Sequence, residues 1–201
     1  MSEDKELLID RDKYLAHGVH IGTKAQHKDM EDYIYHVKKN KLAVLNLEDT
    51  DKQIRKAAEK LAEYNPEDIL IVGRKDEAKE AIDQFSKATN VQTVIGRFMP
   101  GSFTNPESEN FTEPEIVMVT DPETDKQAIQ EARQTNKQVI AIADSENQLD
   151  NINLVIPANN KSEKSLGLVY YLIAQQLLKQ KGETLEKDKD LFTPEIETEE
   201  E

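Results

Sequence analysis

Short, uninterrupted apolar runs alternate along the middle of the chain with longer segments in which apolar residues recur at every third or fourth position. The runs are typical of buried strands, and the periodic segments are typical of helices that bury one face. Two capping boxes, at 50–53 and 124–127, predict where two of the helices begin. The predicted strands are 42–47, 69–72, 91–95, 116–119, 139–143 and 154–156. The predicted helices span 50 to about 62, a segment containing 78–85, a segment that ends near 132, and about 162 to 181.

The order of these elements predicts the fold class. Buried strands that alternate with helices favour a parallel sheet covered on both faces. Right-handed crossovers then give a doubly wound α/β domain of the flavodoxin-like or Rossmann-like kind. The segment 12–37 breaks the pattern, because it holds two glycines and all four histidines. We expect it to form an irregular N-terminal extension, with a short helix, a loop and a short strand beside the main sheet.

Charge divides the chain into three parts. We expect an acidic N-terminal arm at 1–12, a single α/β domain at 13–182, and an acidic, disordered tail at 183–201. The formal net charge is -14, and most of it lies in the arm and the tail, so the domain itself is only mildly acidic. Cysteine is absent, which excludes disulfides, thiolate metal sites and cysteine catalysis. No apolar run is long enough to cross a membrane as a helix.

A glycine-containing segment and four histidines in the N-terminal part are candidates for a nucleotide site and a metal site. The segment 18–24 superficially resembles a phosphate-binding loop, but its spacing is one residue short and its threonine and lysine are exchanged. This argues against a nucleotide site. Histidines can bind Zn²⁺, although packing or hydrogen-bonding roles are more common for residues with this spacing. The four histidines are His17, His20, His27 and His36.

Acidic residues that follow predicted strands suggest an alternative function. Asp49, Asp121 and Asp144 would converge on Mg²⁺ in a receiver-like or phosphotransfer domain, because the carboxyl ends of parallel strands share one edge of the sheet. Aspartate also starts helices and turns by accepting backbone N–H bonds, and this simpler role explains the same residues. A second alternative is a protein-binding module that uses the acidic tail.

The segment 96–106 leaves a predicted strand and contains two glycines, two prolines and two phenylalanines, yet it starts no helix. An ordinary surface loop would not expose Phe98, Met99 and Phe103. Two interpretations remain open for these three side chains. They pack beneath the loop, or they contact a protein partner.

Basic residues gather in the N-terminal part and at two other places. Each alone is most simply a solvated surface residue, but together they would bind the phosphates of a nucleic acid. The amides at the start of the last helix would add to such a site. The candidate RNA-binding residues are Lys24, Lys28, Lys38, Lys39, Lys41, Arg97, Lys161 and Lys164.

Several collinear motifs resemble those of one known family. The segment 14–23 is similar to the N-terminal signature of the small-subunit ribosomal protein S-two family, in its archaeal and eukaryotic branch, which includes the laminin-receptor-precursor proteins. The segments 96–105, 113–129, 144–147 and 155–162 resemble its later motifs in the same order. The resemblance extends from about 13 to 182.

The resemblance implies a flavodoxin-like fold and a function as a structural constituent of the small ribosomal subunit in translation. It places the protein in the cytoplasm, on the solvent side of the subunit between head and body. It implies binding to ribosomal RNA and to neighbouring ribosomal proteins, with no catalytic role, cofactor, metal or membrane contact. The basic residues above would then contact the RNA backbone, and Phe98, Met99 and Phe103 would pack within their loop or contact a neighbouring protein.

Overall fold

The computed structural model describes residues 7–185 and Phe192, and the remaining parts of the predicted arm and tail lie outside the described residues. The helices are α1 (Arg11–Ala16), α2 (Leu47–Ala62), α3 (Lys79–Thr89), α4 (Lys126–Gln134) and α5 (Glu163–Gln180), with 3-10 turns η1 (Lys28–Tyr33), η2 (Pro66–Asp68) and η3 (Asp76–Ala78). The strands are β1 (Ile34–Val37), β2 (Ala43–Leu45), β3 (Ile69–Gly73), β4 (Gln92–Ile95), β5 (Ile116–Val119), β6 (Gln138–Ala143) and β7 (Leu154–Pro157).

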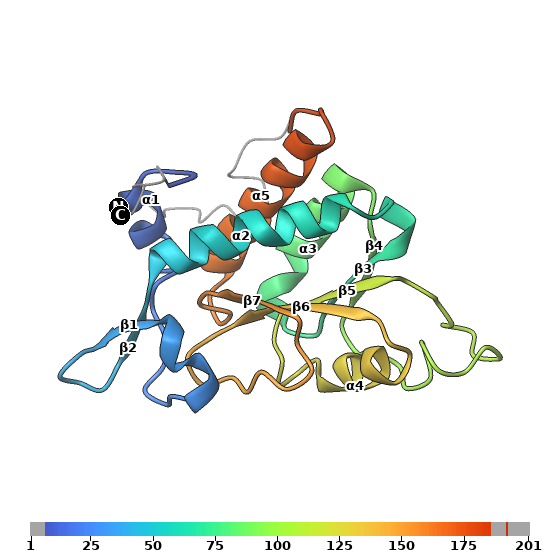
Figure 1. Ribbon diagram of the computed structural model, residues 1–201, viewed down its shortest axis with the longest axis horizontal. Helices are drawn as coiled ribbons and strands as arrows, with labels where there is room; N and C mark the ends of the chain where they lie inside the picture. Colours follow the sequence, from blue (N-terminus) through green and yellow to red (C-terminus); the bar gives the residue numbers. More distant parts are fainter. Residues whose placement is uncertain (1–6, 186–191, 193–201) are drawn as a thin grey trace, which may run out of the picture.

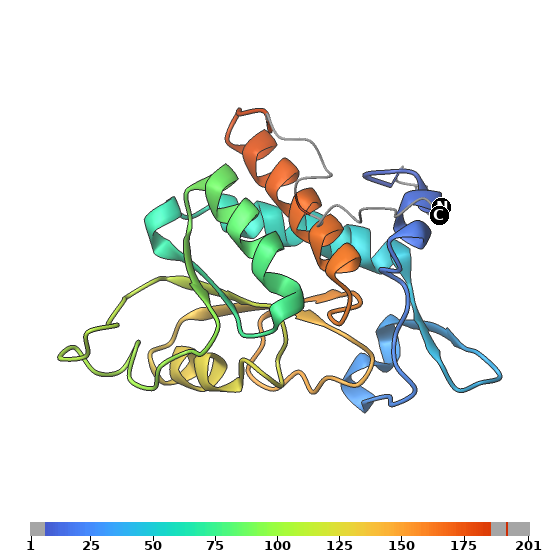
Figure 2. The ribbon, with the colours of Figure 1, turned by 180° about the vertical axis from the view of Figure 1, so that it is seen from behind.

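Five of the strands form a parallel sheet in the order β4-β3-β5-β6-β7. Helices α2, α3 and α5 cover one face, and α4 lies against the other (Figures 1 and 2). The chain runs outward from β3 to β4 and then returns past β3 to β5, so the strand order reverses between β3 and β5. This order is that of a flavodoxin-like fold, and it confirms the predicted fold class. Among the described residues, no helix is long and apolar enough to span a bilayer.

The prediction that 42–47 forms a strand is confirmed only in part. β2 occupies the middle of that segment but does not join the parallel sheet. It pairs antiparallel with β1, and the two strands form a hairpin that projects from one end of the molecule (Figure 1). An apolar run indicates burial without specifying the neighbour. Here Leu45 is buried in a small separate cluster with Met30 and Val155.

The two predicted capping boxes are wrong. α2 begins three residues before Thr50, and its N-cap is Asn46, whose side chain accepts a hydrogen bond from the Glu48 N–H at 3.2 Å. Thr50 lies inside the helix and donates its hydroxyl to the Pro157 carbonyl at 2.6 Å. α4 begins at Lys126, beyond Thr124, and no side chain caps it. A residue that can cap does so only where the chain enters the helix.

Parts of the predicted arm and tail contact the domain. The Leu8 N–H donates to Asp51 Oδ1 at 2.7 Å, and the buried Asp51 also accepts the Tyr14 hydroxyl at 2.8 Å. Phe192 is fully buried, and its ring meets that of Tyr171 edge-to-face at 5.5 Å. Residues from both ends of the chain therefore pack on the layer of helices, through Asp51 of α2 and Tyr171 of α5.

Candidate nucleic-acid interface

Ligands of flavodoxin-like folds bind at the carboxyl edge of the sheet, where the strand order reverses. In this protein an ion pair occupies that position. Lys75, which follows β3, places its Nζ 2.6 Å from Oδ2 of Asp121, which follows β5. Lys75 also donates to the Asn160 carbonyl and side-chain oxygens at 3.3 Å, and Asn147 donates to the other Asp121 oxygen at 3.1 Å. The crevice is therefore filled by a hydrogen-bonded network of the chain's own side chains.

The magnesium alternative is not supported by this geometry. Asp49 accepts a hydrogen bond from Asn46 at 2.7 Å at the start of α2, while Asp121 pairs with Lys75. Within the described ranges, no three histidine, aspartate or glutamate side chains lie close enough to hold a metal ion. None of the four histidines therefore belongs to such a group within these ranges.

Two buried aspartates lie near the ion pair. Burial raises the pKa of Asp125 to about 6, although its carboxylate accepts the N–H groups of Asp121 and Arg74. Burial also raises the pKa of Asp144 to about 6, despite the hydrogen bond from the Ser145 N–H. No partner is found for Asp144 Oδ2 among the described residues. These carboxylates are therefore costly to keep charged at neutral pH.

We expect Asp144→Asn to stabilise the fold at neutral pH. A raised folded-state pKa contributes stability that is complete below the unfolded-state pKa and is lost as pH rises through about 6. The neutral amide avoids that loss, so the free energy of unfolding should rise by about 2 kcal/mol at pH 8 and little at pH 4. Urea denaturation at both pH values measures this. An equal change at the two pH values would contradict the assignment.

The segment 18–24 is a packing element of the irregular N-terminal extension. Gly18 adopts a left-handed conformation with φ +67°, which favours glycine. A Cβ on Gly22 would lie 2.9 Å from Ser145 Oγ and 3.1 Å from the Ala43 carbonyl oxygen. The Thr23 N–H donates to the same Ser145 hydroxyl at 2.9 Å. The glycines thus let this segment lie between β2 and the carboxyl end of β6.

The loop 96–106 buries two of its three large apolar side chains. Phe98 and Phe103 are buried against the α4 face of the sheet, with their ring centroids 5.0 Å apart. Both rings pack in a cluster with apolar side chains of β3, β5, β6 and α4. Met99 differs, because 46% of its surface is exposed.

A buried glutamate on α4 holds this loop in place. The Glu131 carboxylate accepts the Gly101 N–H at 2.7 Å and the Phe103 N–H at 3.0 Å, and Gln127 donates to it at 2.8 Å. Burial alone would raise the pKa of Glu131, but these hydrogen bonds, with one from Thr104, outweigh it and lower the pKa. The charged carboxylate therefore organises the loop backbone.

We expect Glu131→Ala to cost about 3 kcal/mol of stability at neutral pH, because the buried Phe103 N–H and the partly buried Gly101 N–H lose a charged acceptor. The depressed pKa means that this stabilisation is present above the unfolded-state pKa and is lost as pH falls through the lower folded-state pKa. The variant should therefore lose less stability on acidification than the unchanged protein. The exposed Glu123→Ala is the control for urea denaturation, and similar losses in both variants would refute the role.

The structure separates the predicted basic residues into three groups. Lys38, Lys39 and Lys41 lie at the tip of the β1–β2 hairpin, and Lys24 and Lys28 lie in the segment next to it. Arg97 follows β4, whereas Lys161 and Lys164 lie at the start of α5, beyond β7. Since β4 and β7 are the two edge strands, these last groups are roughly 19 Å apart. Lys161 is also neutralised by an ion pair with Glu146.

The hairpin is positively charged on an otherwise acidic protein. The segment 33–47 contains three lysines and a histidine but no acidic residue. Within the described residues, none of its lysines forms an ion pair, and neither does Lys24 or Lys28. The pKa of His20 is lowered, first by burial and then by the positive charges of Lys38 and Arg11. The arrangement offers exposed cations that no carboxylate of the described chain neutralises.

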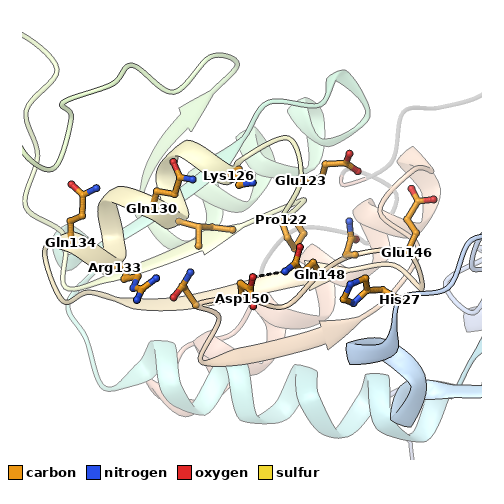
Figure 3. Close-up of a pocket in the computed structure, with 13 residues that line it drawn as sticks. His27, Pro122, Glu123, Lys126, Gln130, Arg133, Gln134, Glu146, Gln148 and Asp150 are labelled. Atoms are coloured by element: carbon orange, nitrogen blue, oxygen red, sulfur yellow. Dashed lines mark hydrogen bonds between the residues drawn. The ribbon is translucent and has the colours of Figure 1, made fainter.

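A groove of about 910 Å³ lies between α4 and the β6–β7 connection (Figure 3). Lys126 and Arg133 lie on its α4 wall, and Gln148 and Asp150 lie across from them, joined to each other by a hydrogen bond. Glu146 adds a second acid to that side. Because both signs of charge line it, the groove is a poorer phosphate site than the hairpin. Sequence reasoning missed this groove, and it missed Lys75, whose position just after a buried strand was the available signal.

Comparison with known proteins identifies the family. The model of the ribosomal protein S2 family matches residues 14–109 and 107–179. The small ribosomal subunit protein uS2 of Methanococcus maripaludis strain C5 is 44% identical over 179 residues, which are 89% of this chain and 81% of that protein. The same protein of strain C6 is 42% identical over the same shares. The chain therefore belongs to the ribosomal protein S2 family.

Proposed function

We propose that this protein is a structural component of the small ribosomal subunit in the cytoplasm and that its β1–β2 hairpin binds ribosomal RNA. The observation that carries the RNA contact is the acid-free hairpin, at whose tip Lys38, Lys39 and Lys41 have no ion-pair partner among the described residues. The membership of the S2 family and the names of its relatives support the ribosomal role.

Electrostatics favours the hairpin as the site of first contact. Lysines that bind phosphates release condensed counterions, and this release supplies much of the affinity for RNA. The rest of the domain carries a mild excess of acidic residues, so the cationic hairpin also favours one orientation of approach to RNA. Lys24 and Lys28, in the segment next to the hairpin, would contact the same region of the RNA, whereas Arg97, Lys161 and Lys164 would contact other parts.

The ion pair at the carboxyl edge of the sheet supports a scaffold role. Ligands of this fold class bind where the strand order reverses, and here Lys75 and Asp121 occupy that position. Met99, exposed on a loop whose backbone is held by Glu131, is suited to contact a neighbouring ribosomal protein.

Lysine footprinting tests the proposed RNA surface. Acetic anhydride would modify the free protein and the protein within small subunits from its own cells, and mass spectrometry would compare the reactivity of each lysine. We expect protection of Lys38, Lys39 and Lys41 in the subunit, with the exposed Lys87 on α3 as the reactive reference. Equal acetylation of hairpin lysines in both states would overturn the proposed interface.

A further inference from the structure

The hairpin carries an aromatic residue whose placement its packing does not explain. Tyr35 is 68% exposed and Val37 is 45% exposed, and both belong to β1. The hairpin projects from the molecule (Figures 1 and 2). Its surface has an apolar part, formed by the exposed tyrosine and valine, and a cationic part, formed by three lysines.

The local backbone directs the Tyr35 ring outward. Ile34 pairs with Leu45 and His36 pairs with Val44, so β1 advances two residues while β2 advances one. Tyr35 is the extra residue of this β-bulge. Bulges change the direction of a side chain and often lie beside functional sites. The ring therefore lies outside the alternation that buries Leu45 and partly buries Ile34 at the base of the hairpin.

A second ring supports the first. The centroids of Tyr35 and His36 are 5.3 Å apart, with an interplanar angle of 82°. This edge-to-face contact restricts the Tyr35 side chain, most of whose surface stays exposed to a partner. Restricting a side chain before binding reduces the entropy lost on binding.

We propose that Tyr35 stacks on an unpaired base of RNA while Lys38 and Lys39 hold the adjoining phosphates. Bases within a duplex are already stacked, and the major groove of duplex RNA is too narrow for side chains to read. An exposed ring is therefore useful only against a base in a loop, bulge or strand end. The lysines of the hairpin and its lack of acidic residues favour RNA over a protein partner. Contact with a protein would desolvate lysines that have no ion-pair partner among the described residues.

This inference rests on the proposed function, and it makes a separate prediction. The sequence contains no tryptophan, so Tyr35→Trp creates a single fluorescent reporter in the full-length chain. The probe is small-subunit ribosomal RNA purified from the source cells. Stacking should quench the emission of this variant on binding. The control is Gln180→Trp, on the last exposed residue of α5, far from the hairpin (Figure 1).

Affinity measurements complete the test. Tyr35→Phe should bind this RNA as the unchanged protein does, whereas Tyr35→Leu should bind roughly tenfold more weakly, because only an aromatic ring stacks. RNA binding with unchanged emission of the Tyr35→Trp variant, or equal affinities of the Phe and Leu variants, would overturn the stacking while the proposed function stands. Failure of the unchanged protein to bind this RNA would overturn both.

Discussion

Replacing Lys38, Lys39 and Lys41 together with glutamine should weaken binding to small-subunit ribosomal RNA by about a hundredfold at physiological salt. Each lysine lies at the hairpin tip, without an ion-pair partner among the described residues, so each is free to bind a phosphate. Loss of three phosphate contacts should also reduce the slope of log affinity against log salt by about 2. Filter binding over a series of salt concentrations measures both quantities.

The control for this variant must change the net charge by the same amount. Lys56, Lys87 and Lys179 are exposed on α2, α3 and α5, away from the hairpin. Their joint replacement with glutamine should change affinity and slope much less. Equal losses in the two triple variants would mean that RNA responds to total charge, which would refute the hairpin as the interface. Both variants should unfold at similar urea concentrations, because all six lysines are exposed.

The largest loss of stability is expected for Lys75→Met, at about 3–5 kcal/mol, because it leaves the buried Asp121 carboxylate without its cation. The methionine retains most of the apolar stem of lysine, so the loss reports the charge rather than a cavity. The Asn147 side chain and the Glu123 N–H still donate to Asp121 Oδ1, but two neutral donors do not offset a buried charge. Urea denaturation of the full-length chain measures the change.

Two further variants isolate the interaction. Adding Asp121→Asn to Lys75→Met removes the uncompensated charge and should recover much of the lost stability. The exposed Lys79 forms an ion pair with the exposed Asp76, and Lys79→Met should change stability by only about 0.5 kcal/mol. If the double variant were as unstable as the sum of both single ones, the ion pair would not be the source of the effect.

Periodicity and apolar runs predicted the sheet and its helices because each signal reflects burial that the sequence itself encodes. The predicted last helix, about 162 to 181, corresponds to α5 at Glu163–Gln180. The apolar run at 42–47 predicted a buried strand but did not specify which strand it pairs with. β2 pairs with β1, and its Leu45 packs against Met30 of η1. The capping box at Thr50 was a wrong prediction, because Asn46 precedes Thr50 and caps α2.

Features that depend on distant contacts could not be predicted. Whether Phe98 and Phe103 pack or face a partner depends on α4, which contributes Glu131 to the loop backbone. The division of the basic residues depends on strand order, which places Arg97 and Lys161 beyond opposite edge strands. The bulge at Tyr35 depends on the register between β1 and β2, which neither strand specifies alone.

Co-sedimentation with small ribosomal subunits tests the central claim most directly. The tagged full-length chain would be expressed in its own cells, and lysates would be separated on sucrose gradients at the ionic strength of the cytoplasm. We expect the protein to migrate with the small subunit in equal stoichiometry with its RNA. Protein that remains at the top of the gradient, while other small-subunit proteins sediment normally, would contradict the claim that it is a structural component of the subunit.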